Sequence, residues 1–324
     1  MKCIAVPKKK AEEVRKMLIE KNLLIKNFKI KRNNKYVYFP IKKDIDIDSC
    51  FITEEIFEKK EKKSYDKLLK EKGIELKSIS IDIIGDIAVI RLKNYENLEE
   101  IAKAIMEANR NVRVVCIDKG IEDEYRIRKI EIIYGCRTET IHREYGLKMK
   151  LDISKVYFSP RLSMERKRIA MQVKENEIVI DMFAGIAPFS LVIAKFSKPK
   201  KIYAIDKNPY AVNYAIENVK MNKMQDIIEV IEGDARKILP KLPHANHIIM
   251  NLPHKSHEFF DIAIEKGKCI HYYEIIEKNK IKERIERLID MANKKGHDIE
   301  VKDIRAIGSY SPSKEKYGID IEVK

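Results

Sequence analysis

The spacing of hydrophobic and polar positions predicts a small βαββ unit at the start of the chain. Apolar residues run together where strands are expected, and they recur at helical spacing at Ala11, Val14 and Leu18. Asn33-Asn34 separates two strand-like runs and is typical of a hairpin turn. The predicted elements are a strand at 2–6, a helix within 8–24, and strands at 28–32 and 36–41.

A second unit, with its own mixture of strands and helices, is predicted from about residue 75 to residue 150. Before it, sequence rich in Lys and Glu from Glu54 to Lys72 predicts a linker or a solvated helix. Gly85-Asp86 lies between two strand-like runs and predicts another hairpin. The predicted elements are strands at 78–84 and 87–92, a helix at 98–108, and strands near 112–117, 125–133 and 138–151.

The third unit alternates strand-like and helix-like patterns from residue 151 to residue 295, and then closes with two strands at 299–306 and 317–323. Such alternation is typical of a parallel sheet with helices on both faces. A final strand pair without a helix between its strands suits an antiparallel edge. We therefore predict an α/β protein with three parts, which are a small domain with its linker at 1–60, an α+β middle domain at 61–150 and a larger Rossmann-like domain at 151–324.

The charge balance favours a negatively charged partner. The 324 residues include 66 Lys and Arg against 51 Asp and Glu, which gives a formal net charge of +15, while the hydrophobic content of 44% is that of a globular protein. A surplus of this size favours nucleic acid as the partner. The alternative is a solvated, Lys-rich surface, because many basic residues have acidic counterparts.

Cysteine usage and the N-terminal sequence indicate the compartment. Five cysteines without a C-x-x-C pair match neither a disulfide framework nor a cysteine zinc site, and they suit a reducing environment. The first residues, Met1 to Lys10, lack the apolar core of a signal peptide, and no apolar run is long enough to span a bilayer. We therefore expect a cytoplasmic protein without a membrane span.

Candidate chemistry begins at Val179–Ser190, which has the pattern of a buried strand, a turn of small residues and the start of a helix. The next apolar run, Ile202–Ile205, is followed directly by Asp206. Rossmann-like domains hold a nucleoside with such a turn and a carboxylate at the end of the next strand. Because the turn lacks a full G-x-G-x-x-G, the pattern favours a nucleoside cofactor without a pyrophosphate and disfavours a nicotinamide dehydrogenase.

Two further predicted strands also end in polar side chains. Asp234 follows the strand that begins at Glu229, where it suits either an adenine amino group or the cap of a helix. Asn251-Leu252-Pro253-His254 follows the apolar run Ile248–Met250 and is a near variant of the N-P-P-Y type motif of nitrogen-directed methyltransferases. The four features in this order resemble a class I S-adenosylmethionine-dependent methyltransferase domain.

Further motifs narrow this resemblance. They are Asp152–Leu162, Glu165-Arg166, Asp181–Gly185, Asn251–Pro253, His271–Tyr273, Tyr310–Pro312 and Tyr125–Arg128. In combination they resemble the archaeal and eukaryotic tRNA (guanine-37, N1)-methyltransferase family over essentially the whole chain. The resemblance implies a class I methyltransferase domain with a mostly parallel seven-stranded sheet and an antiparallel edge, preceded by two small α+β domains.

The same resemblance implies a reaction and its partners. S-adenosylmethionine is the expected cofactor, N1 of guanosine 37 in tRNA is the expected methyl acceptor, and the N-terminal domain is expected to recognise the outer corner of the tRNA. We expect a monomer without a metal ion, because the reaction needs none. The His-rich stretch, His244, His247, His254 and His257, has no cysteine or acidic ligand at zinc-site spacing.

The resemblance also assigns roles to residues. Glu165 is the expected base at N1 and Arg126 the donor to O6 of guanine, with Asn251 and Pro253 at the target base. Both charged residues also suit simpler structural roles, since Glu165 is favourable in the first turn of any helix and Arg126 is favourable on a charged surface. The expected cofactor contacts are Tyr157, Arg166, Asp181, Phe183, Gly185, Asp206, Lys207, Asp234, Ala235 and Asn251.

Three alternative functions are compatible with the sequence. An aminocarboxypropyltransferase of the wyosine pathway shares fold and cofactor, although that family lacks the Asn-Leu-Pro pattern. A bifunctional enzyme that also methylates 4-demethylwyosine shares all of these motifs. An RNA-binding protein with a relic fold is the alternative outside enzymes. The intact site residues Asp206, Asp234, Asn251 and Glu165 argue against it. Ala187 leaves it open, because the family usually has glycine there and a methyl group is expected to crowd the cofactor.

Overall fold

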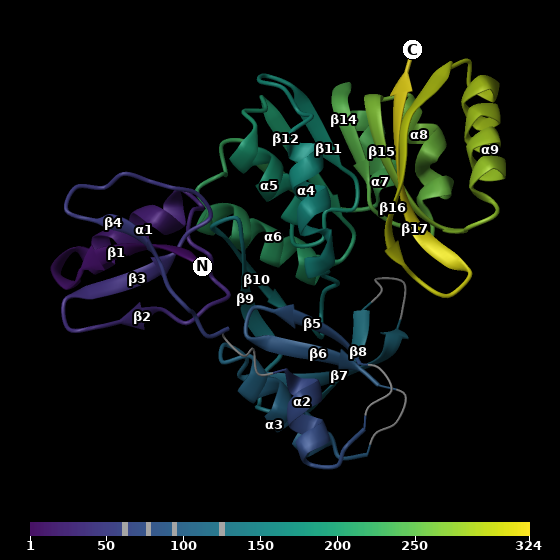
Figure 1. Ribbon diagram of the computed structural model, residues 1–324. Coiled ribbons are helices and arrows are strands. Elements are labelled where there is room, and N and C mark those ends of the chain that lie inside the picture. Colours follow the sequence, from purple (N-terminus) through teal and green to yellow (C-terminus); the bar gives the residue numbers. More distant parts are fainter. Residues whose placement is uncertain (60–63, 76–78, 93–95, 123–126) are drawn as a thin grey trace. The chain divides into compact units, whose positions relative to one another are not determined.

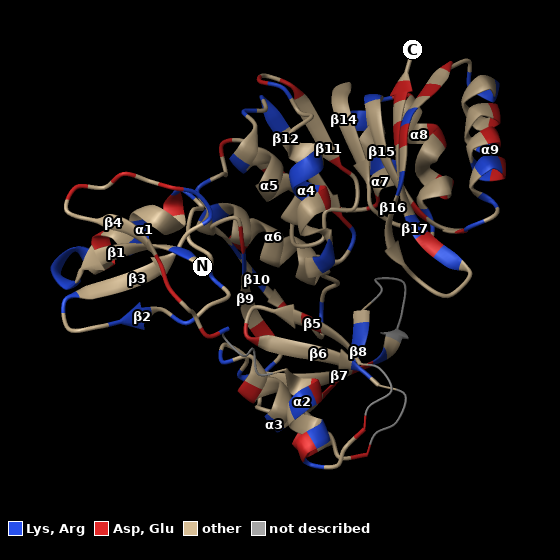
Figure 2. Ribbon diagram, viewed as in Figure 1, with Lys and Arg blue, Asp and Glu red and all other residues tan. Residues whose placement is uncertain are grey.

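The computed structural model describes residues 1–59, 64–75, 79–92, 96–122 and 127–324 (Figure 1). They form two compact units, Met1–Ser64 and Tyr65–Lys324. Lys and Arg are distributed over both units, as Figure 2 shows. No helix among the described residues is long and apolar enough to cross a membrane.

The first unit is a four-stranded antiparallel sheet with one helix packed on it. The strand order is β2-β3-β1-β4, and Val14 and Leu18 of the helix share a core with Ile4 of the sheet. The predicted strand, helix and hairpin are present, but β4, which pairs with β1, was not predicted because its side chains are largely exposed. The elements are β1 (Lys2–Pro7), η1 (Lys8–Lys10), α1 (Ala11–Glu20), β2 (Lys31–Arg32), β3 (Tyr36–Pro40) and β4 (Phe51–Glu54).

The second unit begins with a four-stranded sheet of order β5-β6-β7-β8 and two helices. Strands β6 and β7 run parallel, and the helix between them buries Ile101 and Ile105. The segment predicted as a linker or a solvated helix contains α2, whose Leu69 is buried in the same core. The elements are α2 (Tyr65–Glu71), β5 (Ser80–Ile84), β6 (Ile87–Arg91), α3 (Leu98–Ala108), β7 (Val114–Glu122) and β8 (Ile127–Tyr134).

The segment 138–151, predicted as one strand, is a hairpin of β9 (Glu139–Glu144) and β10 (Leu147–Asp152). The single-strand prediction was wrong because strand-like alternation continues on both sides of Tyr145-Gly146. These two residues have positive φ angles of 50° and 78°, and they reverse the chain. Gly146 is suited to this conformation because it has no Cβ.

The remaining residues form the predicted α/β part, a seven-stranded sheet of order β13-β12-β11-β14-β15-β17-β16. The first five strands in this order are parallel, and β17 and β16 are antiparallel to their neighbours. The predicted mostly parallel sheet with an antiparallel edge is therefore confirmed. The strands are β11 (Ile178–Asp181), β12 (Lys201–Asp206), β13 (Ile228–Glu232), β14 (Ala245–Met250), β15 (Gly267–Glu277), β16 (Ile299–Ser309) and β17 (Lys314–Val323).

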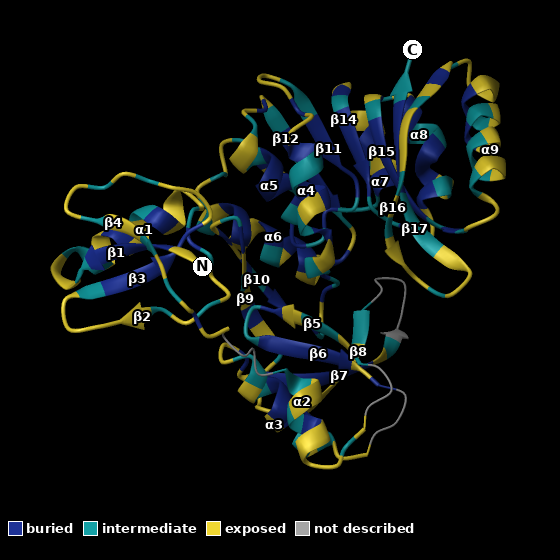
Figure 3. Cartoon of the chain, viewed as in Figure 1, coloured by how far each residue is buried: buried dark blue, intermediate teal, exposed yellow. Residues whose placement is uncertain are grey.

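Helices cover both faces of this sheet, and the central strands are buried between them (Figure 3). One core contains residues of α4, α5 and α6, and the other contains residues of α7, α8 and α9. The helices are η2 (Pro160–Leu162), α4 (Ser163–Ala170), α5 (Pro188–Phe196), α6 (Pro209–Met221), α7 (Ala235–Ile238), η3 (Leu239–Lys241), η4 (Ser256–Phe259), α8 (Phe260–Ile264) and α9 (Ile281–Lys294).

Candidate active site

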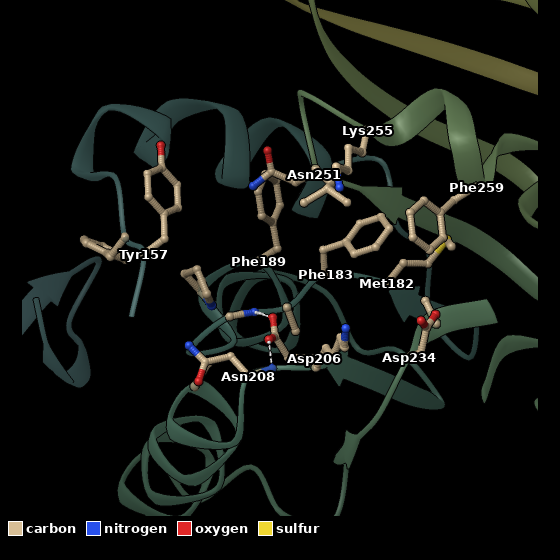
Figure 4. A pocket seen from close by; sticks show the side chains of 18 of the residues that line it. Tyr157, Met182, Phe183, Phe189, Asp206, Asn208, Asp234, Asn251, Lys255 and Phe259 are labelled. Atoms are coloured by element: carbon tan, nitrogen blue, oxygen red, sulfur yellow. Dashed lines mark hydrogen bonds between the residues drawn. The ribbon is translucent and has the colours of Figure 1, made fainter. Parts of the chain in front are cut away.

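A cavity lies at the carboxyl ends of β11, β12, β13 and β14, where ligands bind in open α/β sheets (Figure 4). Nine of the ten expected cofactor contacts line it, and Asp181 is the exception. Hydrophobic residues outside the set of expected contacts also line the cavity. They include Met182, Phe189, Leu252 and Phe259. The strand-end pattern therefore located the cavity, whereas several residues of its apolar walls were not among the expected contacts.

Asp206 ties two turns of the cavity together. Its Oδ2 accepts the N–H of Gly185 at 2.6 Å, and its Oδ1 accepts the N–H of Asn208 at 2.9 Å (Figure 4). Burial raises the pKa of Asp206, although these backbone hydrogen bonds oppose the shift. Each carboxylate oxygen has a second lone pair, so Asp206 still has acceptors for a pair of hydroxyl groups.

The turn after β11 contains two residues in the left-handed region. Gly185 has φ of 56° and lines the cavity, whereas Ala187 has φ of 65° and is fully buried outside the cavity lining. The methyl group of Ala187 therefore does not border the cavity, contrary to the expectation that it crowds a cofactor. A left-handed φ is less strained for glycine than for alanine, which explains why glycine is usual at this position.

Asp181 supports the same turn from beneath. It is buried at the end of β11, where its Oδ2 accepts the hydroxyl hydrogen of Ser190 at 2.9 Å. Its Oδ1 is buried without a hydrogen-bond partner among the described residues. Burial raises the pKa of Asp181 to about 7, an effect that the Ser190 hydrogen bond opposes and the charge of Asp206 increases.

Aromatic side chains form an apolar wall of the cavity. The rings of Phe183 and Phe259 meet edge to face, with centroids 4.9 Å apart, and the Arg236 guanidinium lies 3.9 Å from the Phe259 centroid. Asp234, at the start of α7, accepts the backbone N–H of Arg236 at 2.9 Å. The two interpretations of Asp234 are therefore compatible, because it caps a helix and also lines the cavity.

Arg166 lines the cavity, but its guanidinium is engaged in a buried ion pair. Its Nε and Nη2 donate to the two oxygens of Glu144 at 2.9 and 2.5 Å, and its Nη1 donates to the carbonyl of Ser159 at 3.2 Å. Glu144 belongs to the β9–β10 hairpin, so Arg166 joins this hairpin to the cavity wall. No sequence pattern indicates this pairing, because the two residues are 22 positions apart.

A groove adjoins the cavity within the second unit and shares Tyr157, Ser159 and Leu162 with it. Pro253 lines this groove together with four basic residues, Arg91, Arg128, Arg161 and Lys316, and with two acidic residues, Asp82 and Asp118, which pair with the arginines. The Lys316 ammonium donates to Oδ1 of Asn251 at 2.8 Å, which links the groove to the cavity. Arg126, the expected donor to O6, lies outside the described residues.

Glu165 lies in the first turn of α4 and is buried, but it is not among the residues that line the cavity or the groove. Its Oε1 accepts the Tyr273 hydroxyl hydrogen at 2.7 Å. Arg168 donates to both oxygens at 2.9 Å, and Nη2 of Arg305 donates to Oε1 at 2.8 Å. The expected base is thus held behind the cavity by two guanidinium groups and a phenol.

The His-rich stretch is dispersed by the fold. His247 points to His271, His254 packs against Tyr310, and His257 lies near Glu274. Among the described residues, no group of three or more His, Cys, Asp or Glu side chains is arranged to hold a metal ion. The same residues include five free cysteines.

Family models match three consecutive segments of the chain. Residues 140–302 match the TRM5/TYW2 methyltransferase domain. The chain belongs to the TRM5/TYW2 methyltransferase family. Residues 3–49 match the tRNA methyltransferase 5 N-terminal domain, and residues 63–138 match the TYW2 N-terminal domain.

Known proteins of this family are similar over different shares of the chain. The tRNA (guanine(37)-N(1))-methyltransferase Trm5b of Pyrococcus abyssi is 40% identical, covering 99% of this chain and 98% of that protein. A tRNA(Phe) (4-demethylwyosine(37)-C(7)) aminocarboxypropyltransferase of Methanocaldococcus jannaschii is 39% identical, covering 71% of this chain and 92% of that protein. The solved complex of aTrm5 with tRNALeu is 34% identical, has a TM-score of 0.70, and covers 99% of both chains.

Proposed function

We propose that this protein transfers a methyl group from S-adenosylmethionine to N1 of guanosine 37 in tRNA. The observation that carries the proposal is the match to Trm5b along 99% of the chain, together with a cavity that contains Asn251 and Leu252 of the Asn-Leu-Pro motif. tRNA is the partner that the net charge of +15 suits. With this substrate we place the enzyme in the cytoplasm, and we retain the expectation of a monomer.

The aminocarboxypropyltransferase reaction is the main competitor, and the N-terminal unit disfavours it. The relative with that activity matches 71% of this chain, whereas the methyltransferase relative matches 99%. Residues 3–49, in the first unit, match the tRNA methyltransferase 5 N-terminal domain. We propose that this unit recognises the outer corner of the tRNA, as the resemblance implies.

The cavity offers hydrogen-bond acceptors and apolar walls that suit S-adenosylmethionine. Asp206 offers free lone pairs to ribose hydroxyls, Phe183 and Phe259 offer an apolar wall to adenine, and Gly185 lets a ligand approach the backbone. When bound, the cofactor supplies an electrophilic methyl group.

Methylation of N1 requires removal of its proton and stabilisation of charge on O6 of guanine. We assign proton removal to Glu165 and the donor to O6 to Arg126. Glu165 needs a free lone pair for this step, so one of its guanidinium donors must shift when the target base arrives. We expect the extruded base to reach Asn251 through the groove that Pro253 lines, where basic side chains outnumber acidic ones.

The proposal is tested with unmodified tRNA transcripts that carry either guanosine or adenosine at position 37. Purified protein is incubated with each transcript and with S-adenosylmethionine labelled in its methyl group. We expect label in the guanosine transcript and none in the adenosine transcript. Equal labelling of both transcripts would refute the assignment to N1 of guanosine 37.

A further inference from the structure

A row of buried ionisable groups extends from Glu165 away from the cavity. Nδ1 of His271 on β15 lies 2.9 Å from Oδ1 of Asp320 on β17. Nε2 of His271 lies 3.0 Å from Nδ1 of His247 on β14, and the two rings are parallel within 3°. Nε2 of His247 lies 3.0 Å from Oε2 of Glu177, just before β11. We call His247 and His271 the imidazole pair.

Asp320 connects the imidazole pair to Glu165 through two shared guanidinium groups. Arg168 donates to Oδ2 of Asp320 at 2.7 Å and Arg305 donates to Oδ1 at 3.0 Å, while the same two side chains donate to Glu165. Asp320 and Glu165 therefore compete for the same two cations. A change of charge next to Asp320 alters how strongly it attracts them.

Hydrogen-bond counting fixes the number of protons on the imidazole pair. Three contacts join its four ring nitrogens to each other and to Glu177 and Asp320, and ionised carboxylates accept hydrogen bonds but cannot donate. Satisfying all three contacts needs three N–H groups, whereas two neutral imidazoles have two. The hydrogen-bond geometry therefore calls for one additional proton on the pair.

Charge counting gives the same answer. The carboxylates of Glu165, Asp320 and Glu177 oppose two guanidinium groups, so one more positive charge makes the buried network neutral. Isolated charge is expensive in a protein interior, which favours the neutral network. Asp303, which also pairs with Arg305, is half-exposed, so water screens its charge.

A second additional proton is unfavourable near neutral pH. Burial and the neighbouring charge of His271 lower the pKa of His247 to about 4, although Glu177 opposes the shift. Burial alone raises the pKa of Asp320, but the hydrogen bond and charge of His271 and the charge of Arg168 outweigh it and hold that pKa below its usual range. The ionisable groups near the pair on other elements are Glu177, Arg168, Arg305 and Asp320. On β15, Cys269 and Tyr273 lie two residues before and after His271, on the same face of the strand.

We propose that the imidazole pair positions Glu165 through Asp320, with one shared proton that keeps Asp320 from drawing the two guanidinium groups away from Glu165. The catalytic consequence rests on the proposed function, in which Glu165 takes the proton from N1. The proton count does not depend on that function. His271 and His247 are thus positioning residues that touch neither the cavity nor the groove.

The proton count is tested by nitrogen-15 NMR of the full-length protein labelled at histidine. Signals of the pair are assigned with His247→Asn and His271→Asn variants, and the ring nitrogens are then read in the wild-type protein at pH 7. We expect three protonated nitrogens among the four. One proton on each ring at pH 7 would overturn the proposal, as would two fully protonated rings.

The coupling to Glu165 is tested with Glu177→Gln, which removes one negative charge at the far end of the row and keeps the side-chain shape. The network is then neutral without the shared proton, so we expect the variant to lose that proton at pH 7. We expect kcat to fall about tenfold at pH 7 with both KM values unchanged, and to recover as the pH is lowered. His297→Asn, at a histidine outside the row, serves as the matched control.

Two results would overturn the positioning role. One is a Glu177→Gln variant that has lost the shared proton but keeps the wild-type pH profile of kcat. The other is a rise in KM without a change in kcat. A wild-type protein that does not methylate guanosine 37 would instead refute the proposed function, while the NMR count of protons would stand on its own.

Discussion

At the scale of single residues, Glu165 is restrained more strongly than a solvent-exposed carboxylate. Tyr273, Arg168 and Arg305 all donate to it, and the side chain is buried. This arrangement holds the carboxylate in place in the free protein, and one guanidinium donor must shift before Glu165 can accept the proton of N1. Glu165 borders neither the cavity nor the groove in the free protein, so its replacement removes no part of the wall of either.

Replacing Glu165 with Gln tests whether its role is separable from binding. The amide keeps the size of the side chain but cannot take a proton, so we expect kcat to fall by about a hundredfold or more. The dissociation constants for tRNA and cofactor, measured by filter binding and calorimetry, are expected to stay within about threefold. Glu175→Gln on the exposed surface is the matched control. Loss of tRNA affinity in step with kcat would show that Glu165 serves binding and not catalysis.

The turn after β11 offers a reciprocal pair of substitutions. A Cβ at Gly185 meets only the carbonyl of Tyr157, at 3.8 Å, but the φ of 56° strains any side chain there, so Gly185→Ala adds both a methyl group and backbone strain to a turn that lines the cavity. We expect it to weaken cofactor binding about tenfold, since an added methyl group in a tight site costs about 1.4 kcal/mol. Ala187→Gly is expected to leave that affinity within about threefold. Calorimetric titration with S-adenosylmethionine checks both, and a larger effect at Ala187 would contradict the geometry.

The raised pKa of Asp181 predicts that the free energy of unfolding depends on pH. Its pKa is raised to about 7 in the folded protein, whereas an unfolded Asp titrates near about 4. Between these values the folded state binds a proton that the unfolded state releases, so the free energy of unfolding decreases as the pH rises, and it levels off above about pH 7. Asp181→Asn is expected to remove this decrease, which is on the order of a few kcal/mol.

Urea unfolding between pH 5 and pH 8 measures this effect. The difference in stability between Asp181→Asn and the wild type should grow in favour of the variant as the pH rises. Asp298→Asn, at an exposed position, serves as the control and is expected to give a constant difference. Parallel stability curves for Asp181→Asn and the wild type would contradict the raised pKa.

The positions of site residues were predictable where these residues lie at the ends of predicted strands. Asp206, Asp234 and Asn251 each follow an apolar run, and the parallel sheet brings them to one edge. The ion pair of Arg166 with Glu144 was not predictable, because it joins segments whose relation exists only after folding. The pairing of His247 with His271 was not predictable for the same reason, since the two residues become neighbours only when β14 and β15 align.

At the scale of elements, the β9–β10 hairpin is fastened to α6 by two asparagines one helical turn apart. Asn218 accepts the N–H of Lys150 at 2.6 Å and donates to its carbonyl at 3.0 Å. Asn222 makes the same two contacts with Lys148, at 3.0 and 2.6 Å. The side-chain amides thus continue the edge of β10 as a neighbouring strand would.

Asn218→Ala tests this attachment. Asn218 is fully buried, so its loss leaves the backbone groups of Lys150 without partners, and we expect a loss of about 2 kcal/mol or more in the free energy of unfolding. Asn222→Ala removes the same kind of contact at a partly exposed position, where water replaces the amide, and is expected to cost less than about 1 kcal/mol. Thermal unfolding of both variants gives the comparison. Equal losses would show that burial does not decide the contribution.

Elements with a strong repeating pattern were predicted well, and those defined by a partner were not. The alternating strands and helices after residue 151 follow the prediction because the central strands β11, β12 and β14 are largely buried apolar runs. Strand β4 was missed because its four residues are mostly exposed and it exists through pairing with β1. The β9–β10 turn was missed because the alternation of side chains did not stop at Tyr145.

At the scale of the whole molecule, the two units divide the expected work between recognition and chemistry. The first unit matches an N-terminal domain of tRNA methyltransferase 5, and the second contains the cavity, the groove and Glu165. Positive charge is present on both units, which suits a large polyanion contacted at more than one place (Figure 2). The fraction of this chain that each relative matches, 99% for the methyltransferase against 71% for the aminocarboxypropyltransferase, favours methyl transfer more than the cavity alone does.

The chemical group that reaches guanosine 37 decides between these two activities. A tRNA transcript with guanosine 37 is incubated in parallel with S-adenosylmethionine labelled in its methyl group or in its carboxyl carbon, and the product nucleoside is identified by mass spectrometry. We predict 1-methylguanosine, with methyl label in the tRNA and no carboxyl label. Carboxyl label in the tRNA, or a methyl group elsewhere than on N1 of guanosine 37, would contradict methyl transfer to N1.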